Sequence, residues 1–343
     1  MKSTKTALIT GITGQDGSYL AKFLLDKNYT VYGTVRRGAS EKFSRLEFLE
    51  IKDKVKFIDF DLLELSNIQQ VVKDIRPDEI YNLAAQSFVP TSFSLPILTS
   101  DINALGVVRL LDTILNVNKN IRFYQASTSE MFGKVQEVPQ NELTRFYPRS
   151  PYGVSKLFSH YMTINYRESY DLFACSGILF NHESPLRGHE FVTKKIVSSL
   201  AKIKQGKEEC LYLGNIEAQR DWGHAKDYVE AMWLMLNADI PEDYVVSSGK
   251  TTSVREFIEK TLDRLDFEYE WTGEGINNTL IDKRENKVII KIDKRLYRPA
   301  EVDLLIGDSS KIIDRLKWSP NYNLNTLIDD MVDFEINNSK FNF

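Results

Sequence analysis

The sequence predicts an α/β fold, in which a doubly wound parallel Rossmann sheet is followed by a smaller mixed α/β C-terminal lobe. Short β-rich runs alternate with longer helical stretches through the first half of the chain, and this alternation is typical of parallel βαβ units. A glycine-rich turn follows the first predicted strand, Thr6–Thr10. After about residue 181 the alternation weakens and polar, turn-rich segments appear. We therefore expect a Rossmann domain over residues 1–180, with later returns near 220–250, and a second lobe formed mainly by residues 181–343.

Each element follows from hydrophobic periodicity and from turn-forming residues. Strands are predicted over β-branched and aromatic runs, namely Thr6–Thr10, Val31–Val35, Val55–Asp59, Glu79–Ala84, Ile121–Ser127 and Leu172–Phe180. Helices are predicted where apolar residues recur at helical spacing, namely Ser18–Lys27, Ser66–Lys73, Asn103–Asn116, Pro151–Ser169, Ser253–Leu265 and Leu324–Phe334. Ligands of such open sheets bind beyond the carboxyl ends of the strands. Residues that directly follow a predicted strand are therefore the first candidates for a functional site.

Composition and charge exclude several classes of protein. The chain has 343 residues, of which 42% are hydrophobic and 27% charged, as in ordinary globular proteins. Its net charge of −4 gives no basic field for nucleic acid. No apolar run is long enough to cross a membrane, and Cys175 and Cys210 lack a Cys-x-x-Cys spacing. We expect a cytoplasmic protein with free thiols, no nucleic-acid or membrane partner and, because the four histidines lack zinc-site spacing, no metal.

The turn after the first predicted strand has the pattern G-x-x-G-x-x-G, with glycines at Gly11, Gly14 and Gly17. Glycines allow a backbone to approach a pyrophosphate closely, and the N-terminus of the following helix offers free N–H groups to an anion. The alternative is a purely structural turn between strand and helix. We predict a dinucleotide-binding loop made by Gly11, Thr13, Gly14, Gln15, Asp16 and Gly17.

The end of the second predicted strand indicates which dinucleotide binds. An NAD-preferring site has an acidic residue there for the ribose 2′-hydroxyl, whereas this chain has Arg36 and Arg37. Two guanidinium groups favour a 2′-phosphate, so we predict NADP; solvated surface arginines are the alternative. Residues after the third and fourth strands are predicted to flank the adenine and the middle of the cofactor, namely Asp61, Leu62, Leu83, Ala84 and Ala85.

A phenol and an ammonium lie four residues apart at Tyr152 and Lys156, which places them on one face of a helix. A nearby cation and an oxidised nicotinamide both favour the phenolate, so Tyr152 could remove a proton from a hydroxyl group. The alternative is an ordinary pair on a helix surface. Glu130, at the end of the fifth predicted strand, adds a carboxylate able to abstract a proton from carbon; the alternative is a helix cap.

These motifs together resemble the extended short-chain dehydrogenase/reductases, and within them the GDP-mannose 4,6-dehydratase family. The resemblance covers nearly the whole chain and is carried by Gly11–Ser18, Ala126–Gly133, Phe146–Tyr152, Leu179–Pro185, Arg220–Tyr228 and Arg298–Asp303. Related glucose-nucleotide dehydratases have adjacent Asp and Glu where this chain has Ser129 and Glu130, which favours the GDP-mannose branch.

The resemblance implies a reaction and the residues that carry it. Tyr152, tuned by Lys156 and aided by Thr128, would take the C4 hydroxyl proton while a hydride passes from C4 to NADP⁺. Glu130 would then remove the C5 proton and help protonate the leaving C6 hydroxyl, and the same hydride would return to C6. The product would be a 4-keto-6-deoxy sugar. His182 would join the cofactor site together with Tyr152 and Lys156.

The resemblance also implies contacts to a GDP-sugar and to other subunits. The implied sugar-nucleotide contacts are Ser87, Glu130, Asn181, Val192, Lys195, Gly214, Asn215, Arg220, Arg298 and Glu301. A homotetramer built from two dimers is implied, with Arg45 reaching a neighbouring subunit's cofactor. The helices Asn103–Asn116 and Pro151–Ser169 would form the dimer interface, and their apolar residues Leu110, Phe158 and Met162 are either interface or core.

The chain departs from the family pattern near the expected sugar end. Phe88, Pro90 and Leu186 replace the usual residues, and Gly153 replaces a common alanine. We therefore hypothesise that the substrate is either GDP-D-mannose or a GDP-D-glycero-D-manno-heptose. Two other functions stay open at this point: a nucleotide-sugar 4-epimerase, which needs Tyr152 but not Glu130, and a non-catalytic NADP sensor.

Overall fold

The computed structural model describes residues 4–36, 43–297, 304–338, 341 and 343. Its centre is a parallel sheet of seven strands in the order β3-β2-β1-β4-β5-β6-β10. The strands are β1 Thr6–Thr10, β2 Thr30–Val35, β3 Lys56–Asp59, β4 Glu79–Asn82, β5 Arg122–Thr128, β6 Ala174–Leu179 and β10 Tyr244–Val246. This confirms the predicted doubly wound sheet. The strand order reverses between β1 and β4, and the crevice at such a point is where ligands bind.

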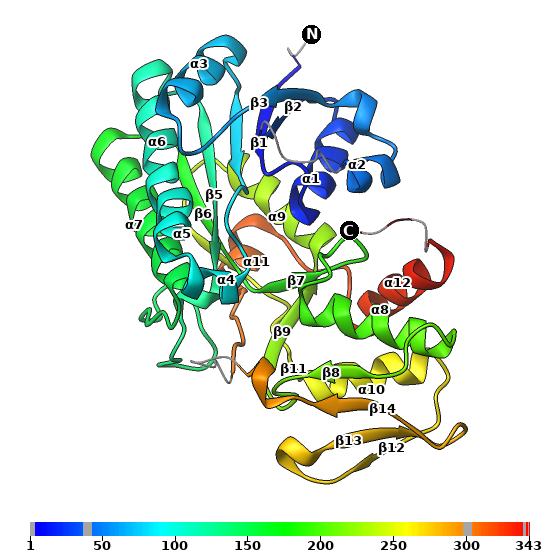
Figure 1. The fold of residues 1–343 in the computed structure, drawn as a ribbon. Helices are drawn as coiled ribbons and strands as arrows, with labels where there is room; N and C mark the ends of the chain where they lie inside the picture. Colours follow the sequence, from blue (N-terminus) through cyan, green and yellow to red (C-terminus); the bar gives the residue numbers. More distant parts are fainter. Residues whose placement is uncertain (1–3, 37–42, 298–303, 339–340, 342) are drawn as a thin grey trace.

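Helices cover both faces of this sheet (Figure 1). One face carries α3 Leu65–Ile75, α6 Gly106–Val117 and α7 Pro151–Tyr170, and the other carries α1 Gln15–Asp26 and α9 Ala225–Leu236. The helix predicted from Asn103 begins with a π-helical turn, η2 Asp101–Leu105, before α6. Short helices complete this part of the chain: α2 Ser44–Phe48, η1 Lys52–Lys54, α4 Val89–Ser94, α5 Pro96–Ser100, η3 Ser129–Met131 and α11 Ser310–Leu316.

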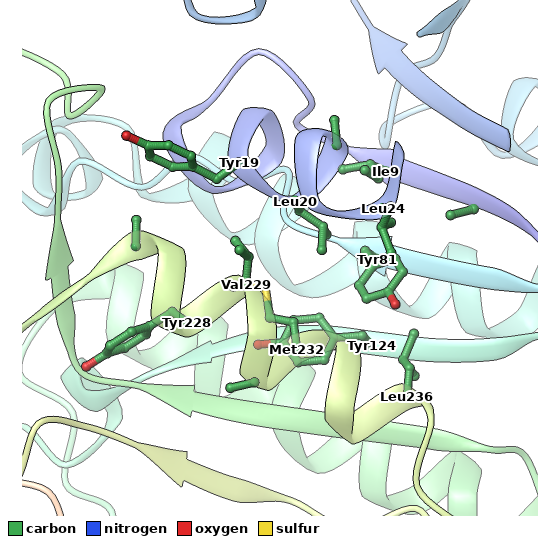
Figure 2. Packing of buried hydrophobic residues seen from close by; sticks show 14 of the residues in the cluster. Ile9, Tyr19, Leu20, Leu24, Tyr81, Tyr124, Tyr228, Val229, Met232 and Leu236 are labelled. Atoms are coloured by element: carbon green, nitrogen blue, oxygen red, sulfur yellow. The ribbon is translucent and has the colours of Figure 1, made fainter. Parts of the chain in front are cut away.

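The core beneath α1 and α9 is built from residues at helical spacing that meet aromatic residues of the sheet. Figure 2 shows Leu20 and Leu24 of α1 facing Met232 of α9 over Tyr81 and Tyr124. All five side chains are fully buried. At roughly 25 cal/mol for each Å² of apolar surface buried, such a cluster holds the glycine-rich start of α1 firmly against the sheet.

The second lobe has a core of its own. A mixed sheet in the order β12-β13-β14-β8 packs against helices α8, α10 and α12, below the large sheet in Figure 1. Its elements are α8 Val192–Lys204, β8 Leu211–Leu213, α10 Val254–Arg264, β12 Tyr269–Thr272, η4 Gly275–Asn277, β13 Thr279–Asp282, β14 Lys287–Ile292, η5 Lys294–Leu296 and α12 Leu324–Asn337. A third sheet, β11-β9-β7, is formed by Thr251–Ser253, Gln219–His224 and Asn181–Glu183.

Candidate active site

A cleft of about 370 Å³ opens beyond the carboxyl ends of β1, β4, β5 and β6. Many residues predicted from sequence line it: Gly11, Thr13, Gly14, Gln15, Asp16, Gly17, Leu83, Ala85, Ser87, Thr128, Glu130, Tyr152, Lys156, Asn181 and His182. These residues come from segments up to 171 positions apart in the sequence (11 to 182), and the parallel sheet brings them together because its strands all end at one edge.

The glycine-rich loop has the geometry that a pyrophosphate requires. Gly11 has a φ of +73°, and a Cβ there would lie 2.9 Å from the Ala84 nitrogen. A Cβ on Gly17 would lie 2.3 Å from the Gly11 carbonyl oxygen, so any side chain would push helix α1 away from the loop. The free N–H groups at the start of α1 then face the cleft. These residues fit the diphosphate of a dinucleotide.

Helix α7 places Tyr152 and Lys156 on its buried face. Pro151 occupies the first turn, and the Ser150 hydroxyl caps the helix by accepting a 3.0 Å hydrogen bond from the Gly153 N–H. Tyr152 is 9% exposed and Lys156 is 4% exposed. The Lys156 ammonium donates a 2.8 Å hydrogen bond to the Ala126 carbonyl of β5 and lies 6.0 Å from the centre of the Tyr152 ring. The ammonium therefore lies beside the phenol without a direct bond to it.

Burial dominates the titration of this pair. It raises the pKa of Tyr152 to about 12, against the opposing effect of a hydrogen bond with Thr128. Burial likewise lowers the pKa of Lys156 to about 8. The protein alone therefore keeps the phenol protonated at neutral pH. The sequence predicts a lowered pKa for Tyr152, and this lowering needs the added positive charge of an oxidised nicotinamide.

Glu130 lies just beyond the carboxyl end of β5, in the short helix η3. The Thr128 hydroxyl starts this turn by accepting a 3.2 Å hydrogen bond from the Glu130 N–H. Gly153 lies against the same turn, and a Cβ there would come 2.8 Å from the Glu130 carbonyl oxygen. Glycine at this position thus lets η3 approach α7 closely. Glu130, Thr128 and Tyr152 consequently line one part of the cleft.

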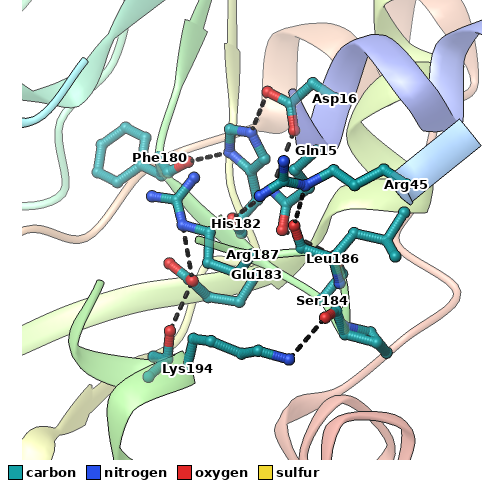
Figure 3. A network of polar contacts seen from close by, with 12 residues as sticks. Gln15, Asp16, Arg45, Phe180, His182, Glu183, Ser184, Leu186, Arg187 and Lys194 are labelled. Carbon is teal, nitrogen blue, oxygen red and sulfur yellow. Dashed lines mark hydrogen bonds and ion pairs between the residues drawn. The ribbon is translucent and has the colours of Figure 1, made fainter. Parts of the chain in front are cut away.

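Arg187, Glu190 and Phe191 also line the cleft and were not predicted, and Arg45, which the resemblance connects with a neighbouring subunit's cofactor, lines the cleft of its own chain. Arg45 donates to Leu186 O at 2.7 Å and to Thr13 O at 3.1 Å, both in its own chain. The Arg187 guanidinium lies 3.5 Å from the centre of the Phe191 ring. Figure 3 shows how Arg45 and Arg187 converge around His182 and Asp16. Arg45 comes from α2, and Arg187, Glu190 and Phe191 come from the turn after β7, where no local pattern marks them.

Other predicted residues lie elsewhere. Among the described residues, the cleft lining omits Arg36, Asp61, Leu62 and Ala84, which sit at or beyond the ends of β2, β3 and β4. Val192, Lys195, Gly214, Asn215 and Arg220 belong to the start of α8, the turn after β8 and strand β9. Lys195 donates to Tyr212 O at 2.6 Å, and Arg220 is 8% exposed. Arg37, Arg298 and Glu301 lie outside the described residues.

Within residues 4–36, 43–297 and 304–338, no helix is long and apolar enough to cross a membrane. The same part of the chain holds no cluster of three or more His, Cys, Asp or Glu residues suited to a metal ion. Cys175 is buried and, like Cys210, is a free thiol.

The fold and this set of side chains define a dinucleotide-binding α/β protein with a buried tyrosine–lysine pair and a carboxylate beside it. The GDP-mannose 4,6 dehydratase family model matches residues 8–331. A GDP-mannose 4,6 dehydratase of Cricetulus griseus is 50% identical, with 98% of this chain and 92% of the relative covered. One of Yersinia enterocolitica is 47% identical, with 98% and 95% covered. The chain belongs to the GDP-mannose 4,6-dehydratase family.

Solved structures with the same fold are more distant in sequence. The dTDP-glucose 4,6-dehydratase of Bacillus anthracis, in complex with NAD, has a TM-score of 0.82 at 19% identity, over 99% of both chains. The UDP-glucose 4-epimerase of Thermotoga maritima has a TM-score of 0.80 at 22% identity, over 96% of this chain and 98% of that one. At such identities the likeness establishes the fold alone.

Proposed function

We propose that this protein is a hydro-lyase that converts a GDP-sugar into its 4-keto-6-deoxy derivative with the help of a bound NADP. The observation that carries this proposal is the presence of Glu130 in the same cleft as Tyr152 and Lys156. A 4-epimerase needs no carboxylate to take a proton from carbon, and a cofactor sensor needs none of the three. In this assignment residues 1–180 mainly bind the cofactor and residues 181–343 mainly bind the sugar nucleotide.

Each residue of the cleft has its own proposed role in the reaction. A bound nicotinamide would supply the hydride acceptor for C4 of the sugar and the hydride donor for C6. Tyr152 accepts the C4 hydroxyl proton, Thr128 holds the same oxygen by a hydrogen bond, and Lys156 supplies positive charge beside the phenol. Glu130 takes the C5 proton and passes a proton to the departing C6 hydroxyl. The buried position of Tyr152 and Lys156 supports these roles, since electrostatic effects are strongest where water is excluded.

The remaining predicted contacts are proposed from their places in the fold. Ser87 and Asn181 line the cleft and would contact the sugar. Val192, Lys195, Gly214, Asn215 and Arg220, together with Arg298 and Glu301, are proposed to hold the GDP. A diphosphate needs cations or N–H donors, and the guanine needs carboxylate or carbonyl acceptors. Asp61, Leu62, Ala84 and His182 are proposed as cofactor contacts.

We expect Arg36→Ala to weaken NADP⁺ binding and to leave NAD⁺ binding nearly unchanged. Arg36 is exposed at the end of β2, where the ribose 2′-phosphate of NADP is expected. Loss of a charge-assisted hydrogen bond costs about tenfold or more in affinity. Fluorescence titration with the two cofactors measures the change, and Arg76→Ala, on a helix end remote from β2, is the control. Equal weakening for both cofactors would contradict the assignment.

We propose that the rim of the cleft decides which sugar of the GDP-sugar is accepted. The Phe88 ring packs edge-on against Phe191, which lines the cleft, with 6.0 Å between ring centres. Leu186, in contrast, is fully buried in the core, so its side chain does not form the sugar wall expected from sequence. The Phe88–Phe191 pair places an aromatic side chain at the rim. We propose that this rim accommodates the extra carbon beyond C6 of GDP-D-glycero-D-manno-heptose and that this sugar nucleotide is the preferred substrate.

Mass spectrometry of the products tests the proposed function directly. Purified protein with catalytic NADP⁺ is incubated with GDP-D-mannose and, separately, with GDP-D-glycero-D-manno-heptose. We expect loss of one water from at least one of them. A higher kcat/KM for the GDP-heptose than for GDP-D-mannose supports the proposal that the rim accommodates the larger sugar. An equal or higher kcat/KM for GDP-D-mannose contradicts that proposal. An unchanged mass with both substrates, while cofactor binds, would overturn the dehydratase assignment.

We propose that α5 and α7 form a subunit interface and that the protein is a homotetramer. Ile97, Leu105, Val154 and Phe158 expose large apolar surface along α5, η2 and α7, with Ile97 84% exposed. Of the residues named from sequence, Leu110 is fully buried and Met162 packs on the core, so only Phe158 is free for this contact. We expect light scattering to give a tetramer, and Phe158→Glu to give a smaller species. A monomeric wild type would contradict the proposal.

A further inference from the structure

His182 joins the glycine-rich loop to strand β7 through both of its ring nitrogens. Nδ1 lies 2.8 Å from the Phe180 carbonyl oxygen, and Nε2 lies 2.8 Å from Asp16 Oδ2 at the start of α1 (Figure 3). A carbonyl oxygen can only accept, and so can an ionised carboxylate. Both nitrogens must therefore carry a proton, which makes His182 an imidazolium.

Tyr228 of α9 covers this ring. Its aromatic ring stacks on His182 with 4.3 Å between centres and 24° between planes. The side chain is fully buried, and among the described residues its hydroxyl has no hydrogen-bond partner. Gly223, which pairs with His182 in the register of β7 and β9, makes room for it: a Cβ there would lie 2.4 Å from the Tyr228 ring. The tyrosine therefore contributes its ring face, and a ring face attracts a cation.

We propose that Tyr228 is a positioning residue, which holds His182 as an imidazolium against Asp16 and so fixes the glycine-rich loop in its cofactor-binding form. The inference rests on the proposed binding of NADP to this loop. Gln15 reinforces the same contact, because it donates to His182 O at 3.1 Å and accepts from the Ser184 hydroxyl at 2.7 Å. The His182 bond is the only one of these whose strength depends on protonation of a histidine ring.

Four side chains that can carry charge or titrate lie around His182. They are Asp16 from α1, Arg45 from α2, Arg187 from the turn after β7 and Tyr228 from α9. Burial alone would lower the pKa of His182, but the Asp16 carboxylate outweighs burial and raises it. The contact is therefore intact at low pH and is lost as the pH rises through the raised value. Above this pH, one of the two ring nitrogens carries no proton and can no longer donate a hydrogen bond to Phe180 O or to Asp16.

Histidine-labelled protein allows the protonation state to be read directly, because the chain has only four histidines. Ring ¹⁵N shifts are followed from about pH 6 to about pH 9, across the ordinary titration range of histidine, and His182→Gln assigns the signal. We expect two protonated nitrogens for His182 above the ordinary pKa of a free histidine. A neutral ring at neutral pH would overturn the proposal, whatever the protein then proves to catalyse.

Cofactor affinity supplies the second readout. We expect Tyr228→Leu to raise the Kd for NADP⁺ by about tenfold and to lower the His182 pKa, whereas Tyr228→Phe keeps wild-type values because the hydroxyl makes no bond. Phe257→Leu is the control for a lost core ring: this residue is also fully buried, but it lies in the separate core of the second lobe. We expect it to lower thermal stability and to leave Kd unchanged.

The outcomes separate this inference from the proposed function. Equal weakening by Tyr228→Phe and Tyr228→Leu, or equal weakening by Phe257→Leu, would overturn the positioning role of the Tyr228 ring. Failure of the wild-type protein to bind NADP⁺ at any pH would instead contradict the proposed cofactor, and the ¹⁵N spectrum of His182 would still report whether the charged contact exists.

Discussion

Glu130→Gln is expected to abolish product formation while the first half of the reaction still takes place. The amide keeps the size and polarity of the side chain but cannot take a proton from C5 of the sugar. General acid–base groups contribute about 10²–10⁴-fold to a rate, so turnover should fall by that factor. Addition of the sugar nucleotide should still produce the absorbance of reduced nicotinamide on the enzyme, because Tyr152 and Lys156 are untouched.

Stopped-flow absorbance and product mass spectrometry together check this outcome. Glu168→Gln, an exposed carboxylate on α7, is the matched control and should behave as wild type. Ordinary turnover in Glu130→Gln would show that another group takes the C5 proton. Loss of the absorbance signal along with turnover would show that Glu130 is needed to bind or orient the sugar, and the separate role in elimination would then be wrong.

Tyr152→Phe is expected to remove both halves of the reaction. Without the phenol oxygen, no group in the cleft takes the C4 hydroxyl proton, and the 4-keto sugar cannot form. We expect a fall of about 10²–10⁴-fold in turnover and no absorbance of reduced nicotinamide after mixing with substrate. Cofactor affinity should change little, because the ring that packs in the buried face of α7 is retained.

The pH dependence of the rate of the first step distinguishes loss of the catalytic base from a general structural defect. Burial raises the pKa of Tyr152 to about 12 in the protein alone, so the phenol needs the added charge of an oxidised nicotinamide to lose its proton near neutrality. The rate of the first step in the wild type should therefore rise with pH, and Tyr152→Phe should lack that limb. Tyr170→Phe, an exposed phenol at the end of α7, is the control. A rising limb that survives in Tyr152→Phe would contradict the assigned base.

Much of the fold could be predicted because local patterns agreed with it. The predicted strand Thr6–Thr10 has the same bounds as β1, and the predicted helix Pro151–Ser169 differs from α7 by one residue at its end. In such segments periodicity, caps and burial point the same way. The short strands of the second lobe were not predicted, because a strand such as β8, Leu211–Leu213, is too short for any periodicity.

The sequence by itself indicated the residues to which the proposed chemistry of the cleft is assigned. The glycines of the loop, the Tyr152–Lys156 spacing and Glu130 after a strand are local features, which the sequence shows without any knowledge of the fold. Only the tertiary structure decided the environment of these groups. Burial of Tyr152 and Lys156, the charged contact of His182 with Asp16 and the stacking of Tyr228 join positions 16, 182 and 228. Titration depends on distance and solvent exposure, and residues so far apart in sequence acquire both only when the sheet folds.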